Sequence, residues 1–242
     1  MAALFTCSID DGHPADLRMA ELLNRHGIAA TFYIPVRNRE GYKVLPGAEQ
    51  RQLDQRFELG SHTLDHCFLK SLPADDAHYQ IVEGKRRLED TLGHEVAGFC
   101  YPGGKFGERD LQMVKSAGFR YARTTANLHP GPGQDAWRMP TTCQFYPHAR
   151  NVYVRNFASQ GEWGERRALL RLALKHEDWL DRIHAMFDHV CQNEGVFHLW
   201  AHSRDIDQLQ AWDQLSSFLA HVAGRLPPAQ RVENGQLAQM SY

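Results

Sequence analysis

The sequence predicts an α/β fold: a distorted (β/α) barrel of about seven strands, formed by a single domain over residues 1–242. Two observations lead to this expectation. Short apolar and aromatic runs alternate with longer helical segments, which is the pattern of parallel strands joined by crossover helices. No linker, internal repeat or low-complexity tract divides the 242 residues, and a chain of this length suits one α/β domain.

The elements of the first half follow in regular order. An apolar run at 4–9 predicts a buried strand, and apolar side chains at helical spacing over 15–26 predict a helix that Gly27 ends. The next strand, 30–34, is stopped by Pro35. The further predicted helices of this half are 49–56, 75–92 and 108–117, and the further strands are 57–60, 98–101 and 121–124.

The second half is less regular. Proline and glycine at 129–133 predict a loop, and 139–145 is a further candidate strand. A last buried strand is expected at 196–200, and the polar tail after Pro228 has room for one short strand. Region 145–180, which carries no chemical motif, is interpreted as a lid or insertion, a substrate wall or a subunit contact. The predicted helices of this half are 162–174, 177–192 and 207–225.

Composition excludes several classes of protein. The 27 Lys and Arg residues nearly balance 29 Asp and Glu residues, so nothing indicates a nucleic-acid partner. No apolar run approaches the roughly 20 residues that an integral membrane segment needs. The five cysteines never form a C-x-x-C pair, and Met1 leads into the first strand without a signal-peptide pattern. We therefore expect a cytoplasmic protein with reduced thiols and leave a homo-oligomer open.

A pair of carboxylates directly follows the first predicted strand. Consecutive strand residues point to opposite faces, so Asp10 and Asp11 can share one site only if the backbone turns there. Gly12 permits that turn, and a cation beside the two carboxylates would relieve their repulsion. The alternative interpretation is a solvated turn.

Two imidazoles follow the predicted strand at 57–60. His62 and His66 are four residues apart, so on a helical turn they would lie on one face and reach one ion. Together with a carboxylate from the first cluster, they make three ligands of the kind that a catalytic zinc takes, with a position left for water. The sequence therefore predicts a divalent metal site, with Zn²⁺ as the expected ion.

Two more motifs follow later strands. The glycines of Tyr101-Pro102-Gly103-Gly104 let the backbone approach a ligand and present an N–H to a developing oxyanion. His202 lies at the exit of the strand at 196–200 and is a candidate site residue, whereas His198, inside that strand, is expected to be structural. All these motifs come after strands, where barrels of this class carry their sites.

In this order the motifs resemble those of the polysaccharide deacetylases, the NodB-homology proteins of carbohydrate esterase family four. The resemblance runs from about residue 4 to residue 205. It implies a NodB-like deacetylase fold and a divalent metal, usually zinc. The segments that carry it are Ser8-Ile9-Asp10-Asp11-Gly12, Ser61-His62-Thr63-Leu64-Asp65-His66, Tyr101-Pro102-Gly103-Gly104 and Leu199-Trp200-Ala201-His202.

The resemblance also implies roles for individual residues. The metal ligands would be Asp11, His62 and His66; Asp10 would be the catalytic base, His202 the general acid, and the Gly103 N–H part of the oxyanion site.

The chain departs from the family pattern in its third motif. Cys100 occupies the position of an arginine that orients the catalytic aspartate, and Gly103 stands where an aromatic residue is usual. We hypothesise that Arg123, in the strand predicted at 121–124, replaces the missing arginine and holds Asp10. A surface ion pair is the alternative for an arginine at a strand end.

The implied activity is metal-dependent hydrolytic N-deacetylation of an N-acetylated amino sugar. Tyr101 and Trp200 stand beside two of the motifs and are predicted to contact the sugar. Because no export signal is visible, we expect an intracellular precursor of a surface polysaccharide or lipopolysaccharide. Two alternatives stay open: an allantoinase-like hydrolase of a small or cyclic amide, and a non-catalytic carbohydrate-binding relic.

Overall fold

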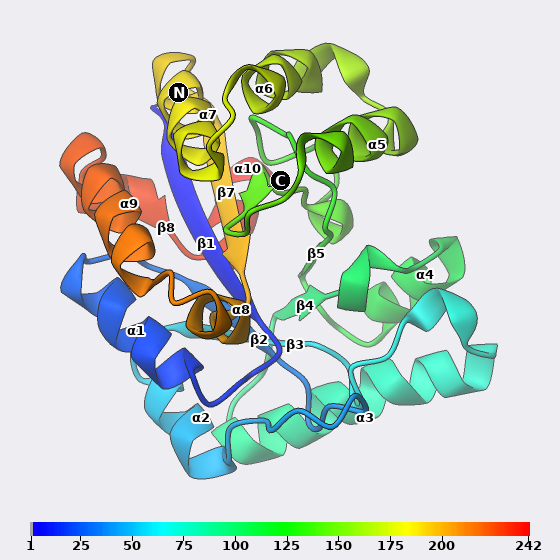
Figure 1. The fold of residues 1–242 in the computed structure, drawn as a ribbon. Coiled ribbons are helices and arrows are strands. Elements are labelled where there is room, and N and C mark those ends of the chain that lie inside the picture. Colours follow the sequence, from blue (N-terminus) through cyan, green and yellow to red (C-terminus); the bar gives the residue numbers. More distant parts are fainter. Residues whose placement is uncertain (1) are drawn as a thin grey trace.

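The computed structural model describes residues 2–242, and a parallel sheet of eight strands forms its centre (Figure 1). The strand order is β5-β4-β3-β2-β1-β7-β6, and β8 pairs with β1 off this path. The strands are β1 (Leu4–Asp10), β2 (Thr31–Ile34), β3 (Glu58–Ser61), β4 (Gly98–Cys100), β5 (Tyr121–Arg123), β6 (Cys143–Gln144), β7 (Val196–Ala201) and β8 (Arg231–Val232). This architecture confirms the predicted α/β barrel.

The segment that leads into β6 joins the two ends of the sheet. Met139 pairs with Arg123 of β5, and its N–H donates to the Ala122 carbonyl at 3.0 Å. Three residues later the Thr142 N–H donates to the His198 carbonyl of β7 at 2.9 Å. The strand predicted at 139–145 shrinks to two residues because Pro140 has no N–H to donate to a ladder. Backbone hydrogen bonds therefore continue around a distorted barrel.

Ten α-helices within residues 2–242 surround these strands, and Figure 1 shows α5 and α6 side by side. They are α1 (Asp16–Arg25), α2 (Gly47–Asp54), α3 (Ala74–Leu92), α4 (Glu108–Ser116), α5 (Arg150–Gln160), α6 (Trp163–Lys175), α7 (Trp179–Gln192), α8 (Ser203–Gln208), α9 (Trp212–Arg225) and α10 (Asn234–Ser241). None of the helices in this described part of the chain combines the length and the apolar character needed to cross a bilayer.

Alternation along β1 separates an apolar layer from a polar interior. Phe5, Cys7 and Ile9 belong to the main core, which packs the strands against the surrounding helices. The side chains between them are polar and buried, and Ser8 Oγ lies 2.9 Å from the Nε2 atom of His198 on the neighbouring strand β7. Asp10, two residues after Ser8, is therefore delivered to the interior at the end of its strand.

The structure differs from the sequence predictions in two helical regions. The helix expected at 207–225 is interrupted, because Gln210 adopts a left-handed conformation with φ 53° between α8 and α9. Helix α5 was not predicted at all, since its sequence has no regular apolar stripe, and Tyr153 is the one residue of α5 that is buried. The region interpreted as a lid or insertion, 145–180, thus contains α5, α6 and the start of α7.

Candidate metal and catalytic site

The end of β1 turns sharply and brings two carboxylates to one region. Asp11 and Gly12 are consecutive left-handed residues, with φ 81° and 61°, so the chain reverses immediately after Asp10. A side chain at position 12 would place its Cβ 2.8 Å from Cγ2 of Ile34, which only glycine avoids. The predicted turn at Gly12 is therefore present, and both Asp10 and Asp11 are buried beside the strand ends.

The two histidines after β3 approach each other without a helical turn, which corrects the geometry assumed from their spacing. Residues 62–68 form no helix, and Thr63 and His66 each adopt a left-handed conformation, with φ 69° and 52°. Helix α3 supports this loop closely, because a Cβ at Gly84 would lie 2.7 Å from the Thr63 carbonyl carbon. The ring centres of His62 and His66 lie 5.0 Å apart.

Asp11, His62 and His66 form a compact set of potential metal ligands. One ligand atom from each lies within 4.8 Å of the others. The Nε2 atoms of His66 and His62 both face Oδ1 of Asp11, at 3.1 and 3.7 Å. This carboxylate oxygen is buried and accepts no well-aligned hydrogen bond. Two imidazole nitrogens and an unsatisfied carboxylate oxygen converging on one point fit a divalent cation.

The protonation of this set also suits a metal. His62 Nδ1 lies 2.8 Å from the Cys100 carbonyl, which can only accept, so Nδ1 carries the proton and Nε2 keeps its lone pair. Burial lowers the pKa of His62 to about 4, so the ring is neutral at pH 7. Burial alone raises the pKa of the Asp11 carboxyl, but His66, His202 and His62 around it hold that pKa well below its usual range. At neutral pH the ionised carboxylate of Asp11 thus faces the neutral imidazole of His62.

Asp10 is held by two groups of the barrel interior. The Arg123 guanidinium forms an ion pair with Oδ1 of Asp10, and the Cys100 thiol lies 3.8 Å from Oδ2. Arg123 is fully buried, and its Cζ lies 5.4 Å from the ring centre of Tyr33 and 5.2 Å from that of Trp200. The residue hypothesised to replace the family arginine is therefore in contact with the aspartate.

The imidazole of His202 lies between the carboxylates of Asp11 and Asp205. Its Nε2 atom is 3.9 Å from Oδ2 of Asp11, and its Nδ1 atom is 3.0 Å from Oδ2 of Asp205. Burial by itself lowers the pKa of His202, but Asp205, Asp11 and Asp10 outweigh burial and raise that pKa. Sequence reasoning missed Asp205. The available signal was an acid three residues after the histidine, in the first turn of α8.

The remaining predicted residues have different surroundings. Gly103 is exposed, with φ 58°, and lines a cavity together with Trp200. Tyr101 is fully buried and stacks on Phe106 with ring centres 3.8 Å apart, so the prediction that it contacts substrate is wrong. Its ring fills the second core cluster. His198 is structural, as expected: its Nδ1 atom lies 3.1 Å from the Pro140 carbonyl.

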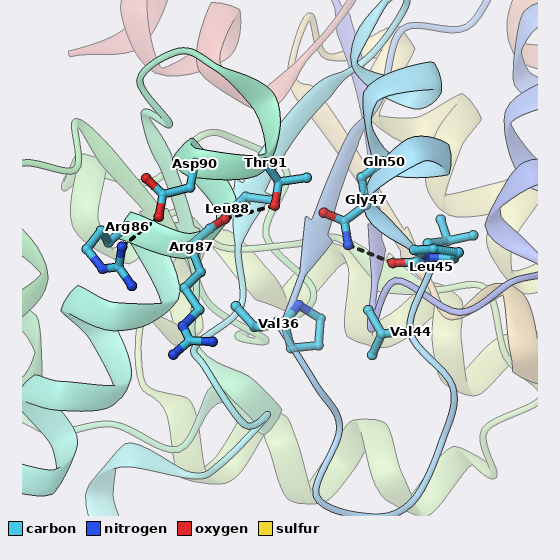
Figure 2. Close-up of a pocket in the computed structure, with 12 residues that line it drawn as sticks. Val36, Val44, Leu45, Gly47, Gln50, Arg86, Arg87, Leu88, Asp90 and Thr91 are labelled. Atoms are coloured by element: carbon cyan, nitrogen blue, oxygen red, sulfur yellow. Dashed lines mark hydrogen bonds and ion pairs between the residues drawn. The ribbon is translucent and has the colours of Figure 1, made fainter.

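A separate pocket of about 500 Å³ lies between α2, α3 and the loop after β2 (Figure 2). Its lining contains none of the predicted site residues. The arginines on its α3 side pair within their own helix, since Arg86 Nη1 lies 2.6 Å from Asp90 and Arg87 Nε lies 2.6 Å from Glu83. This pocket is therefore distinct from the cluster at the strand ends.

Comparison with known proteins gives similarities over part or all of the chain. The family model of polysaccharide deacetylases matches residues 4–122, which include Asp10, Asp11, His62 and His66 but not His202. Peptidoglycan-N-acetylglucosamine deacetylase PgdA of Listeria monocytogenes is 28% identical over 91 residues, which are 36% of this chain. That match spans 18% of PgdA, so this chain corresponds to under a fifth of the curated relative.

Solved structures resemble nearly the whole chain. A candidate polysaccharide deacetylase from Mycobacterium smegmatis is 14% identical, with a TM-score of 0.68 over 99% of this chain and 90% of that one. The family 4 acetyl xylan esterase from Clostridium thermocellum, in complex with a cobalt ion, is 12% identical, with a TM-score of 0.59 over 98% and 91%. At these identities the likeness concerns the fold. The matching family model over residues 4–122 and the ordered motifs at the strand ends support the polysaccharide deacetylase family for this chain.

Proposed function

We propose that this protein is a metal-dependent hydrolase that removes the acetyl group from an N-acetylated amino sugar. The observation that carries the proposal is the convergence of the Asp11, His62 and His66 ligand atoms within 4.8 Å. Asp10, paired with Arg123, has a carboxylate oxygen within 4.8 Å of a ring nitrogen of His62. The match to the family model and the similarity to a peptidoglycan-N-acetylglucosamine deacetylase support an amide of an amino sugar as the bond that is cleaved.

In this proposal Asp11, His62 and His66 hold the divalent cation, with Zn²⁺ as the expected ion. When bound, such a cation supplies Lewis-acid activation of water and of the acyl carbonyl at neutral pH. Both histidines reach the site from one loop, so the ligand set needs only two segments of the chain. The buried carboxylate of Asp11 then gains the partner that its Oδ1 atom lacks.

The chain's own residues move the protons. Asp10 accepts the proton of the attacking water, because its ion pair with Arg123 fixes the orientation of the carboxylate. His202, whose pKa is raised, donates a proton to the leaving nitrogen, and Asp205 on its other ring nitrogen holds the ring in place. The Gly103 N–H, which the exposed left-handed turn presents, is assigned to the developing oxyanion.

The test measures acetate release and bound metal together. The zinc-loaded protein is expected to release acetate from N-acetylated sugars and to lose this activity on chelation. His62→Ala should lose metal and activity, whereas His202→Ala should keep its metal and lose about 10²–10⁴-fold in kcat. His78→Ala, an exposed histidine of α3, is the matched control and should behave as wild type. Equal metal loss in the His62 and His202 variants would contradict the assigned roles.

The substrate panel separates the competing functions. Hydrolysis of allantoin or another cyclic amide, with no acetate release from sugars, would favour the small-amide hydrolase. Sugar binding without turnover by the zinc-loaded protein would favour the carbohydrate-binding relic. The retention of Asp10, Asp11, His62, His66 and His202 around one point supports a catalytic protein over both.

A cytoplasmic location and an intracellular precursor of a surface polysaccharide or lipopolysaccharide complete the proposal. All five cysteines are unpaired, and four of them are buried, which suits a reducing compartment. The measurement is the thiol count of the purified protein in the native and denatured states. Five reactive thiols after denaturation without reductant are expected, and fewer would indicate oxidation that this compartment does not support.

A further inference from the structure

A cavity of about 620 Å³, here called the α5 cavity, lies beside the proposed catalytic residues, and apart from Gly103 its lining has no role in the chemistry above. Helix α5 forms one side of it, and Gly103, Gln144 and Trp200 form the side toward the site. Gln144 Nε2 lies 3.3 Å from Nδ1 of His202, and the rings of Trp200 and His202 meet edge to face at 5.2 Å. A ligand in this cavity would therefore lie next to the proposed general acid, and a volume of this size suits a small molecule.

The lining of this cavity carries positive but no negative side chains. Lys105 and Arg155 are exposed and line it, with His148 between β6 and α5. No Asp or Glu is among its lining residues, and within residues 2–242 neither Lys105 nor Arg155 has a carboxylate at ion-pair distance. The other lining side chains are mostly hydroxyl or amide groups, which can donate hydrogen bonds.

Two buried arginines stand behind the cavity wall and also lack a carboxylate partner at ion-pair distance in the described chain. Arg166 is 0% exposed and donates to the Asn127 carbonyl at 2.8 Å and to Oε1 of Gln160 at 2.9 Å. Arg182 is 4% exposed and donates to the His148 carbonyl at 2.7 Å. Asn127, Gln160 and His148 all line the cavity, so each guanidinium lies one residue behind it.

These arginines make the cavity electrostatically positive. A buried cation that is solvated only by carbonyl and amide dipoles keeps most of its field, because the low-dielectric interior screens it weakly. The pocket in Figure 2 shows the opposite arrangement, since carboxylates of α3 neutralise Arg86 and Arg87 there. The excess positive charge is thus specific to the α5 cavity, because the presence of arginines beside a pocket does not by itself produce it.

We propose that the α5 cavity binds an anionic group of the substrate, so that the proposed deacetylase acts on an N-acetylated sugar that carries a phosphate or carboxylate oxyanion. Lys105 and Arg155 contact the oxyanion directly, and the fields of Arg166 and Arg182 favour its entry. A substrate that extends from this cavity past Trp200 and His202 reaches the ligand set, so its acetamido group lies at the catalytic residues. That the substrate is an N-acetylated sugar rests on the proposed function. That the substrate carries a negative charge rests on the cavity alone.

Binding measured by calorimetry tests the inference without relying on turnover. The probes are inorganic phosphate, N-acetylglucosamine 1-phosphate, glucuronic acid and neutral N-acetylglucosamine. The sugar phosphate is expected to bind at least about tenfold more tightly than the neutral sugar, and its affinity should fall as salt rises. The Lys105→Ala/Arg155→Ala variant should weaken its binding about 100-fold, since each charge-assisted contact contributes about tenfold.

The matched control is Arg167→Ala, which removes an exposed cation of α6 that does not line the cavity and should leave every affinity unchanged. Both target side chains are exposed, and thermal melts of the variants should match the wild type. Tighter binding of phosphate than of glucuronic acid identifies a phosphorylated substrate, and the reverse identifies a uronate. Equal affinities for charged and neutral sugars, or an unaffected double variant, would overturn the inference.

The same experiment separates this inference from the proposed function. If the sugar phosphate binds in a Lys105- and Arg155-dependent manner but no acetate is released, the anionic site stands and the deacetylase proposal fails. If neutral N-acetylated sugars are deacetylated with no preference for charged ones, the deacetylase proposal stands and the anionic site fails.

Discussion

Arg123 and Asp10 form an ion pair inside the barrel in which the two side chains are 0% and 4% exposed. The two residues are 113 positions apart, and Arg123 reaches the aspartate from β5, next to the strand that ends in Cys100. Nε and Nη1 of Arg123 are buried without hydrogen-bond partners. An arginine kept in so costly a position is expected to serve the aspartate that it contacts.

Arg123→Met should therefore impair both folding stability and turnover. Removing one partner leaves Asp10 buried and unpaired, so the free energy of unfolding should fall by about 3–5 kcal/mol and kcat by at least about 10²-fold. Urea unfolding and acetate release measure the two effects. The Asp10→Asn/Arg123→Met double variant should regain much of the stability but none of the activity. Wild-type turnover in Arg123→Met would end the proposed role.

Asp205→Asn should lower kcat about tenfold while KM and metal content stay near wild type, because Asp205 contacts the ring of His202 and no metal ligand. Steady-state kinetics on the zinc-loaded protein measure the effect. Asp207→Asn, on the same helix, is the control, since Asp207 contacts Trp212 and Arg18 instead. A change of metal content in the Asp205 variant would show that it acts on the ligand set.

Gly84→Ala should destabilise the protein although alanine favours helices. An added methyl group would meet the Thr63 backbone at 2.7 Å, and moving that backbone displaces the loop that holds both histidine ligands. We expect a loss of about 1–3 kcal/mol in unfolding free energy and weaker zinc binding. A Cβ added at Gly224 in α9 has nothing within 4 Å. Gly224→Ala should therefore raise the free energy of unfolding by up to about 1 kcal/mol. Equal effects of the two substitutions would contradict this packing argument.

Glu233 should make stability depend on pH. Burial, together with the negative charge of Glu58, raises its pKa from 4.5 to about 7 in the folded protein. The folded state then binds this proton more tightly than the unfolded state, so stability falls as pH rises from 4.5 to 7 and levels off above. The urea midpoint of Glu233→Gln should lack this component, and its advantage over wild type should grow across that window. Parallel pH profiles of the two proteins would refute the shift.

Local sequence determined the strands and the residues that follow them. Period-two alternation in β1 and the glycine after Asp11 sufficed to predict a turn that brings two carboxylates together, because both signals act within a few residues. The same locality explains the failures: Tyr101 follows its motif but packs inward, and the helical reading of His62 and His66 missed two left-handed residues in their loop.

Only the tertiary structure decided which distant side chains meet. The register of β5 against β4, with Arg123 opposite Cys100, brings the arginine to Asp10, and the end of β7 brings His202 to Asp11. Helix α5 and its positively charged cavity carried no periodic signal in the sequence. Sequence therefore fixes what is local in the chain, whereas pairings over a hundred residues apart depend on sheet order and helix packing, which many local patterns share.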